Sequence, residues 1–582
     1  MDRTGTSEVG EGHGPLSGRP WLASYAPGVA ADVEVPTDSL PEMLAASAAH
    51  YTNRVALDFF GAETTYERLA DQVARAAEAL RVVGVRTGDR VALVLPNCPQ
   101  HVVAFYAALR LGAVVVEHNP LYTASELEHQ LADCGATVVV CWDKTAAVVD
   151  GLRGSTAIQV IIAVDLTSAL PWHKRLALRL PVAKARAART AMTGPVPHGV
   201  LSWDRVASST GPLDTAHSQP RVQDVALLQY TGGTTGTPKG AILTHSNLQV
   251  NAAQGRAWMP GLKDGEETVY AVLPLFHAYG LTLCLTFSMS VGATLVLLPR
   301  FDLEQMFEAI RRRPPTFLPA VPPIYERLAA AAREGRVDLT SIRYAISGAM
   351  ALPPAVVETW ESVSGGLLVE GYGMTETSPV SLGNPAATTR RPGTVGVPFP
   401  STDIRIVDPD NPLQDLPIGE QGELLIRGPQ VFAGYWNRPD DTAAVLLPGG
   451  WLRTGDIVVA DADGFVRIVD RIKELIITGG FNVYPSEIED VLRELPEIED
   501  LAVVGIRSGG DTGEEVVVAV VPVAGATVDP ERVRAYAHER LTGYKVPRRV
   551  VIVEDLPRSQ MGKILRRRVR DRIEAMEIFG QS

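Results

Sequence analysis

The sequence predicts an α/β protein, in which a large N-terminal domain of parallel-type α/β subdomains precedes a small α+β C-terminal domain. With 582 residues, the chain is longer than one hydrophobic core usually organises. Strand-like and helix-like segments alternate over residues 54–141, a pattern typical of a parallel sheet with helices on its faces. After Arg471 the pattern changes to a unit of about a hundred residues with its own apolar strands.

The alternation begins with a strand over residues 54–60. Thr64, with Glu67 three residues later, forms a capping box that opens a helix, and Gly84 marks the exit. The next predicted elements are strands at 91–96, 113–116 and 137–141, a helix at 100–111, and a helix that runs from a second capping box, Thr123 and Glu126, to Gly135.

These patterns divide the chain into three parts. Residues 1–36 carry Gly, Ser, Pro and scattered charge without the apolar core of a signal peptide, so we expect a partly disordered lead-in. We expect the large domain over residues 37–470 and the small one over 471–582, with the boundary at 470–473. In the small domain we expect helices at 486–495 and 530–541 and strands at 501–506 and 516–523.

Composition narrows the function. Because 46% of the residues are hydrophobic, the chain has enough apolar material for a packed interior, which excludes wholesale disorder. The net charge is −13, so the protein as a whole is not positively charged, and we expect no nucleic-acid partner. Four cysteines without CxxC spacing are too few to staple this chain and suit a reducing compartment. We therefore expect a cytoplasmic protein.

Two segments raise the question of a membrane. Residues 268–299 carry no formal charge, but Pro274, His277 and Gly280 interrupt them, which favours a buried helix and strand over a membrane span. Residues 171–189 interleave leucines with the cations Lys174, Arg175, Arg179, Lys184, Arg186 and Arg189. This stretch fits either a helix on an anionic membrane surface or a solvated excursion, in which Pro181 weakens a single continuous helix.

The most informative motif is YTGGTTGTPKG at residues 230–240, which follows an apolar run. Its glycines allow backbone N–H groups to approach an anion, its threonines add hydroxyl donors, and Lys239 adds a positive charge. A Walker A loop would need Ser or Thr after Gly-Lys, whereas Lys239 stands between Pro238 and Gly240. The loop therefore predicts a phosphate site of another kind.

Two later motifs could complete a nucleotide site. In EGYGMTET, residues 370–377, Tyr372 can lie against a flat base, and Glu376 beside Thr375 offers the hard oxygen ligands that Mg²⁺ prefers. In WLRTGD, residues 451–456, a carboxylate after a tight turn could accept hydrogen bonds from two ribose hydroxyls.

Together, and in this order, the motifs resemble those of the adenylate-forming superfamily of acyl-CoA synthetases, luciferases and nonribosomal adenylation domains. The resemblance covers residues 40–572 and is closest to bacterial long-chain fatty acyl-CoA ligases. It rests on residues 230–240, 370–377, LPLFHAYG at 273–280, GELLIRGPQVFAGYW at 422–436, WLRTGDI at 451–457, DRIKELIITGGFNVYPSEIE at 470–489 and PRSQMGKILRR at 557–567.

The resemblance implies that MgATP and a medium- to long-chain fatty acid form an acyl-adenylate, and that coenzyme A then displaces AMP. It implies that Lys563 bridges the attacking carboxylate and the α-phosphate, and that Glu376 and Thr235 hold Mg²⁺. It implies catalytic roles for Lys563, His277, Thr235 and Glu376. The implied nucleotide site comprises Thr231, Gly232, Gly233, Thr234, Thr235, Gly236, Lys239, Ser347, Gly348, Ala349, Gly371, Tyr372, Gly373, Thr375, Asp456, Arg471 and Lys563.

The resemblance also implies an acyl pocket, a hinge and a coenzyme A side. The pocket would be lined by His277, Tyr279, Gly280 and Val321, the hinge of a mobile C-terminal domain would be Lys473, and the coenzyme A side would hold Gly479, Gly480, Asn482 and Tyr484. Two departures limit the comparison. SGAM at 347–350 carries Ala and Met where the family commonly has glycine, and Ile477 stands where some members have a second lysine.

Two alternatives stay open. One is an acyl-adenylate ligase that loads a carrier protein, although the insertion typical of such enzymes is not obvious before Asp470. The other is a non-catalytic, membrane-bound lipid-binding homologue, against which the joint retention of Lys239, Glu376, Asp456, Arg471 and Lys563 argues. The sequence also leaves open whether the protein binds peripherally to the cytoplasmic face of a membrane. Its oligomeric state, monomer or homodimer, is open as well.

Overall fold

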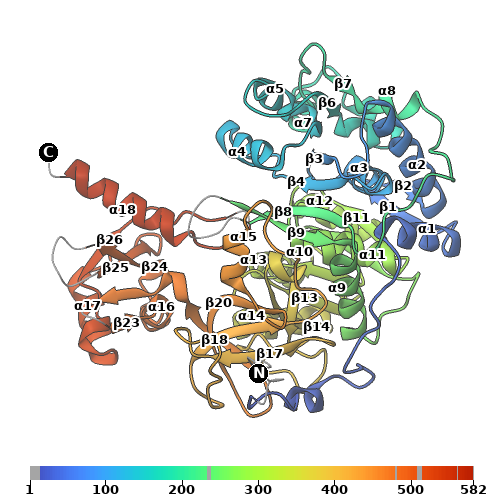
Figure 1. Cartoon of the computed structure of the whole chain (residues 1–582). Coiled ribbons are helices and arrows are strands. Elements are labelled where there is room, and N and C mark those ends of the chain that lie inside the picture. Colours follow the sequence, from blue (N-terminus) through green and yellow to red (C-terminus); the bar gives the residue numbers. More distant parts are fainter. Residues whose placement is uncertain (1–13, 232–237, 479–480, 508–513, 560, 581–582) are drawn as a thin grey trace, which may run out of the picture.

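The computed structural model describes residues 14–231, 238–478, 481–507, 514–559 and 561–580. Figure 1 shows a large body that carries most of the chain and a smaller unit at the C-terminal end, drawn in orange-red. The large body contains two extended sheets and a third, smaller one.

A seven-stranded sheet carries the first part of the chain, in the order β7-β6-β5-β3-β4-β8-β9. All neighbours are parallel except β8 and β9, which form an antiparallel pair. Its strands are β3 (Arg90–Val94), β4 (Val114–Glu117), β5 (Val138–Trp142), β6 (Val160–Val164), β7 (Leu201–Ser202), β8 (Val225–Thr231) and β9 (Lys239–Thr244). Its helices are α2 (Tyr66–Val82), α3 (Pro99–Arg110), α4 (Ala124–Cys134), α5 (Ala146–Gly151) and α8 (Trp203–Ser208).

A nine-stranded sheet follows the order β16-β15-β14-β13-β12-β10-β11-β1-β2 and is parallel from β14 to β1. Its strands are β1 (Val55–Phe59), β2 (Ala62–Thr65), β10 (Thr268–Ala271), β11 (Thr294–Leu297), β12 (Phe317–Ala320), β13 (Tyr344–Ser347), β14 (Leu367–Gly373), β15 (Val380–Gly383) and β16 (Val397–Pro398). The helices of this part are α1 (Leu40–His50), α9 (His245–Trp258), α10 (Ala278–Gly280), α11 (Phe287–Ser290), α12 (Leu303–Arg312), α13 (Pro322–Arg333) and α14 (Pro354–Ser364).

The uncharged segment belongs to the interior of this second sheet. Strands β10 and β11 pair with each other, and the π-helical stretch Leu281–Thr286 between them is buried throughout. The prediction of a buried helix and strand is therefore confirmed. Among the helices that the structure describes, none combines the length and apolarity needed to cross a bilayer.

The third sheet connects the large body to the C-terminal unit. It contains β17 (Asp403–Val407), β18 (Gly422–Arg427), β19 (Leu446–Leu447), β20 (Trp451–Ala460) and β21 (Val466–Arg471), and α15 (Pro439–Val445) lies in the same stretch of chain. The turn predicted before Asp456 is wrong, because the residue lies inside β20; the left-handed Gly455 (φ 72°) only bends that strand.

The C-terminal unit is an antiparallel β24-β25 pair extended by a parallel β26, with apolar clusters on both faces. Its elements are β22 (Ile476–Thr478), β23 (Phe481–Val483), α16 (Pro485–Leu492), β24 (Ile498–Arg507), β25 (Glu514–Pro522), α17 (Pro530–Arg540), β26 (Arg549–Ile552) and α18 (Arg566–Gly580). The predicted helices and strands of this unit are confirmed, with shifts of a few residues at their ends.

Local signals placed both ends of α4 correctly. The box of Thr123 and Glu126 is present, and α4 ends at a left-handed Gly135. The predicted box of Thr64 and Glu67 is wrong, because the N-cap is Thr65, whose hydroxyl accepts a hydrogen bond from the N–H of Arg68 without a reciprocal glutamate.

The lead-in is packed from Gly14 onward, so the expected disorder does not extend to residues 14–36. Trp21 is 1% exposed, Arg19 pairs with Asp403 at 2.8 Å, and Tyr25 packs edge-on against Trp258. The basic stretch forms two helices, α6 (Trp172–Ala177) and α7 (Ala183–Met192), which are separated around Pro181.

Candidate active site

Three predicted nucleotide-site residues meet at the edge of the third sheet. Arg471 and Asp456 are register partners on β21 and β20, and Arg471 Nε lies 3.0 Å from Asp456 Oδ1. Tyr372, at the end of β14, donates from its hydroxyl to Asp456 Oδ2 at 2.5 Å. The negative charge of Asp456 raises the pKa of Arg471, so the guanidinium stays charged. Both oxygens of Asp456 are thus engaged by groups from separate strands.

Lys563 approaches this cluster from the C-terminal unit. The amide of Lys563 donates to Ser559 Oγ at 3.2 Å, and its carbonyl accepts from the amide of Ser559 at 2.7 Å, which closes a tight loop. Burial and the nearby charge of Arg471 lower the pKa of Lys563 to about 8. The loop lies against the large body, because a Cβ on Gly562 would stand 3.1 Å from Met350 Sδ.

Glu376 is a buried carboxylate on the 3₁₀ turn Thr375–Thr377, which follows β14. The hydroxyl of Tyr435 donates to Glu376 Oε1 at 2.6 Å. Burial raises the pKa of Glu376, while the hydrogen bond from Tyr435 opposes that shift. A buried carboxylate of this kind fits Mg²⁺, which uses few protein carboxylates together with substrate phosphates. Among the described residues no group of three or more His, Cys, Asp or Glu side chains could form an all-protein metal cage.

The predicted phosphate loop lies between β8 and β9 in the chain. Thr231 and Lys239 are register partners at its two ends, and Tyr230 is anchored by a 2.6 Å hydrogen bond from its hydroxyl to Asp133. Lys239 Nζ pairs with Asp441 and lies 5.3 Å from the centre of the Tyr435 ring. The predicted residues Gly232, Gly233, Thr234, Thr235 and Gly236 lie outside the described residues.

The predicted adenine wall lies at the ends of β13 and β14. Ser347 is fully buried, Gly348 faces Tyr279, where a Cβ would meet the ring at 3.1 Å, and Ala349 adopts a left-handed φ of 67°. A Cβ at Gly373 would clash with the carbonyl oxygen of Pro379 at 1.8 Å, so only glycine allows the two backbone segments to approach this closely. Gly371 is less restricted, since its nearest neighbour, Ile346 Cγ2, is 3.2 Å away.

The predicted acyl-pocket residues also lie together. Tyr279 donates from its hydroxyl to the carbonyl oxygen of Ile346 at 2.6 Å, and to that of Ala320, next to Val321, at 3.3 Å. His277 caps α10 by accepting from the amide of Tyr279 at 3.2 Å, and burial lowers the pKa of its imidazole to about 4. At neutral pH His277 is therefore uncharged and suits an apolar wall.

The predicted coenzyme A side lies at the start of the C-terminal unit, where the amide of Ser486 donates to Asp470 Oδ2 at 2.9 Å. Asn482 is exposed on β23 and Tyr484 is half-buried at the start of α16, while Gly479 and Gly480 lie outside the described residues. Lys473 lies in the 3₁₀ turn Ile472–Glu474, directly after β21.

Sequence reasoning missed Tyr435, Asp441 and Arg566. Tyr435 stands in a quoted family segment without an assigned role, and Asp441 looks like an ordinary first-turn acidic residue of α15. Arg566, one of several arginines in the tail, instead bridges Glu474 and Glu489, at 2.8 Å from Glu489 Oε2. These three residues can be recognised only by their contacts with residues that are distant in the sequence.

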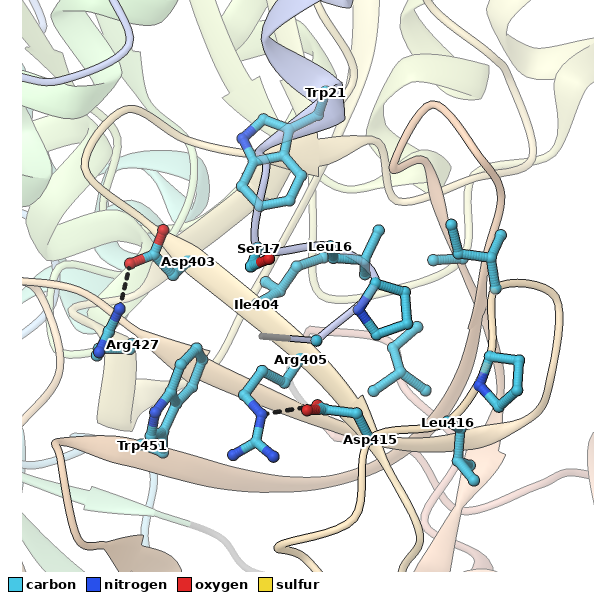
Figure 2. A pocket seen from close by; sticks show the side chains of 16 residues that line it. Leu16, Ser17, Trp21, Asp403, Ile404, Arg405, Asp415, Leu416, Arg427 and Trp451 are labelled. Carbon is cyan, nitrogen blue, oxygen red and sulfur yellow. Dashed lines mark hydrogen bonds and ion pairs between the residues drawn. The ribbon is translucent and has the colours of Figure 1, made fainter. Parts of the chain in front are cut away.

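A separate cavity of about 290 Å³ lies between the N-terminal segment and strands β17 and β18 (Figure 2). Its charged side chains pair with one another: Arg427 with Asp403 at 2.9 Å, and Arg405 with Asp415 at 2.7 Å. None of the predicted site residues lines this cavity, so it is separate from the site.

Two family models and several known proteins match this chain over most of its length. A model described as AMP-binding enzyme matches residues 44–436, and one described as AMP-binding enzyme C-terminal domain matches residues 487–563. A long-chain-fatty-acid–CoA ligase of Bacillus subtilis is 38% identical over 95% of this chain and 98% of the relative. Another from Yersinia pestis is 39% identical over 95% of this chain and 97% of the relative.

Among solved structures, MatB from Rhodopseudomonas palustris is 29% identical. Its ATP-bound form superposes with a TM-score of 0.79 over 92% of this chain and 99% of that chain. Its apo form reaches 0.68 over 93% of this chain and 99% of that chain. The overall arrangement thus resembles the ATP-bound form more than the apo form.

Proposed function

Because the chain belongs to the AMP-binding enzyme family, we propose that it joins a fatty acid to coenzyme A in two steps driven by ATP. It is an acid–thiol ligase that releases AMP and pyrophosphate, as the names of its relatives and their near-complete coverage indicate. The observation that carries the proposal is the convergence of Lys563, from the C-terminal unit, on the Asp456–Arg471 pair of the large body.

In the first step, a carboxylate oxygen of the fatty acid attacks the α-phosphorus of ATP, and the bond to pyrophosphate breaks. Negative charge gathers on the α-phosphate, and the ammonium of Lys563 stabilises it. Asp456 accepts from the ribose hydroxyls, and Tyr372 lies beside the base. In the second step the sulfur of coenzyme A attacks the acyl carbon, the thiol loses its proton, and AMP leaves.

Glu376 would hold Mg²⁺, with Thr235 as a second oxygen ligand, and Lys239 would bind the β- and γ-phosphates. The bound cation supplies charge neutralisation for the triphosphate. The hydrogen bond from Tyr435 holds Glu376 in place, and burial keeps bulk water from competing for the carboxylate.

The two steps need different groups beside the acyl carbon. We infer that the C-terminal domain rotates about Lys473, so that the region around Asn482 and Tyr484 replaces Lys563 for thioester formation. The greater likeness to the ATP-bound MatB structure, and the approach of Gly562 to Met350, support an adenylation arrangement here.

We infer a substrate chain of roughly a dozen carbons or more. The apolar wall around Tyr279 and the buried Leu281–Thr286 stretch support it, since each buried methylene contributes about 0.8 kcal/mol. The test is CoA-dependent AMP release over a ladder of straight-chain acids from acetate to stearate, with an aromatic acid for comparison. A specificity constant that peaks at acetate or at the aromatic acid would refute it.

The same assay separates the alternatives. AMP release without coenzyme A, but with an acyl-carrier protein, would indicate a carrier-loading ligase. Binding of fatty acid without AMP release would indicate a non-catalytic lipid-binding protein.

We also infer that the basic stretch docks on anionic membrane, from which a water-insoluble substrate could be taken. Trp172 is 73% exposed and Leu180 55% exposed, although both are large apolar side chains. No acidic residue occurs between Asp165 and Asp204, so the cations of this region are not balanced within it. Exposed apolar groups among unbalanced cations are the combination that binds anionic lipid surfaces.

A further inference from the structure

We propose that Tyr435 is a positioning residue that holds Glu376 and Lys239 in the arrangement that receives a Mg²⁺–triphosphate. Its hydroxyl donates to Glu376 Oε1 at 2.6 Å, and its ring centre lies 5.3 Å from Lys239 Nζ. One side chain therefore contacts both the expected metal ligand and the expected phosphate ligand. The inference rests on the roles proposed above for Glu376 and Lys239.

The backbone around Tyr435 connects the same two regions. It runs beside β9: the amide of Ile242 donates to Gly434 O at 2.9 Å, and that of Trp436 donates to Gly240 O at 2.8 Å. Tyr435 itself forms an antiparallel bridge with Ala241. At its other end, the amide of Phe432 donates to Glu376 O at 2.9 Å. Residues 432–436 thus tie the strand that begins at Lys239 to the turn that carries Glu376.

The orientation of the ring is set from two sides. Phe432 packs edge-on against it, with ring centres 4.9 Å apart and planes at 72°. The amide of Tyr435 donates to Thr442 Oγ1 at 2.9 Å, which fixes the start of its side chain. With the ring held in this way, the hydroxyl is directed at Glu376 Oε1.

This arrangement separates two opposite charges that would otherwise attract each other. Lys239 lies over the face of the ring and pairs with Asp441, whereas Glu376 accepts from the hydroxyl at the edge. The lysine is therefore held by Asp441 and the carboxylate by the tyrosine hydroxyl, and a bound triphosphate would take the place of Asp441 beside Lys239.

The test measures equilibrium binding, so that no turnover is needed. Isothermal titration calorimetry on the full chain would compare the α,β-methylene analogue of ATP with Mg²⁺ against AMP without metal. For Tyr435→Phe, which keeps the ring over Lys239, we expect the dissociation constant of the Mg²⁺–analogue to rise about tenfold, as for the loss of one hydrogen bond to a charged group. Binding of AMP should stay within about twofold of the wild type.

Tyr536→Phe is the matched control, because Tyr536 donates to Glu494 Oε2 at 2.7 Å on the surface of the C-terminal domain. It should leave both dissociation constants unchanged. Phe432→Leu, which keeps the hydroxyl but loosens the ring, should weaken the Mg²⁺–analogue selectively and by a smaller factor. An equal loss of AMP binding in either variant at Tyr435 or Phe432 would indicate general damage and overturn the proposal.

Two reference variants separate this inference from the function beneath it. If Glu376→Gln and Lys239→Ala weaken the Mg²⁺–analogue but Tyr435→Phe does not, the role of Tyr435 alone is overturned. If neither reference variant weakens it, the proposed roles of Glu376 and Lys239 fail, and the inference about Tyr435 fails with them.

Discussion

Arg471 lies 3.0 Å from Asp456 across the β20–β21 pair, only two residues before the expected hinge at Lys473. Because strand pairing ties Arg471 to the third sheet, a rotation about Lys473 would leave this pair in place. Lys563, on the far side of the hinge, would move away. On the proposed roles, the contact of Asp456 with the ribose would persist through both half-reactions, while Lys563 would serve only adenylation.

Asp456→Asn should raise the free-energy barrier for adenylation by about 2 kcal/mol, or roughly thirtyfold in kcat/KM for ATP, because the ribose loses a charged acceptor. Wild-type enzyme assayed with 2′,3′-dideoxy-ATP should lose a similar factor. For the Asp456→Asn variant, kcat/KM with the dideoxy analogue should be only slightly lower than kcat/KM with ATP. Fully additive losses would show that Asp456 does not act through the ribose hydroxyls.

Lys563→Ala should lower acyl-adenylate formation by about a hundredfold or more, since it removes a cation from the developing charge. Conversion of supplied acyl-adenylate and coenzyme A to thioester should continue. Pyrophosphate release and thioester formation, followed separately, provide the measurement. Arg567→Ala, an exposed cation four residues away, is the control and should affect neither. Equal loss of both half-reactions in Lys563→Ala would contradict the rotating-domain mechanism.

Lys473→Pro should produce the reverse result, because proline fixes φ near −65° in the turn that must change conformation. Adenylate should form, but little acyl-CoA should be released. Lys473→Ala separates the side chain from the backbone and should retain most thioester formation. If the alanine variant loses that step as fully as the proline variant, the side chain of Lys473, and not its backbone, is responsible.

Adenylation should slow at alkaline pH. Burial and Arg471 lower the pKa of Lys563 to about 8, so the ammonium is present below that pH and is lost as pH rises through it. The kcat/KM for adenylation, which reports the free enzyme, should therefore fall above pH 8. Lys563→Arg, which stays charged, should flatten this limb of the profile. A fall centred near the ordinary lysine pKa of 10.5 would contradict the prediction.

Replacing Arg175, Arg179 and Lys184 with Gln should weaken sedimentation with phosphatidylglycerol vesicles at low salt, at about 1 kcal/mol per cation. Activity on detergent-dispersed fatty acid should change little. Lys174 is left intact because it pairs with Glu308 at 2.7 Å.

The matched control carries the same change of charge elsewhere on the surface. Arg221, Lys263 and Arg532, with side chains 86%, 68% and 61% exposed, would be replaced with Gln; each of them pairs with a nearby glutamate or aspartate, but the change in net charge is the same. This control should sediment like the wild type. If both triple variants lose vesicle binding equally, the effect depends only on net charge, and the basic stretch has no special role in membrane binding.

The sequence alone determined the local elements, because their signals lie within a few residues. The box of Thr123 and Glu126 predicted the start of α4, and the charge-free run over residues 268–299 predicted a buried segment. The family, and with it the fold and the reaction, could be recognised from motifs in their order.

Only the tertiary structure decided which of those residues meet. Tyr372 and Asp456 are 84 residues apart, and Tyr435 and Glu376 are 59 apart. The residue spacing of a helix or strand cannot predict contacts over such distances in the sequence. The lowered pKa of Lys563 depends on its burial against Arg471, which needs two domains to be in contact. Propensities and caps act over one or two turns of chain, whereas burial, charge pairing and ring contacts depend on distances that only packing sets.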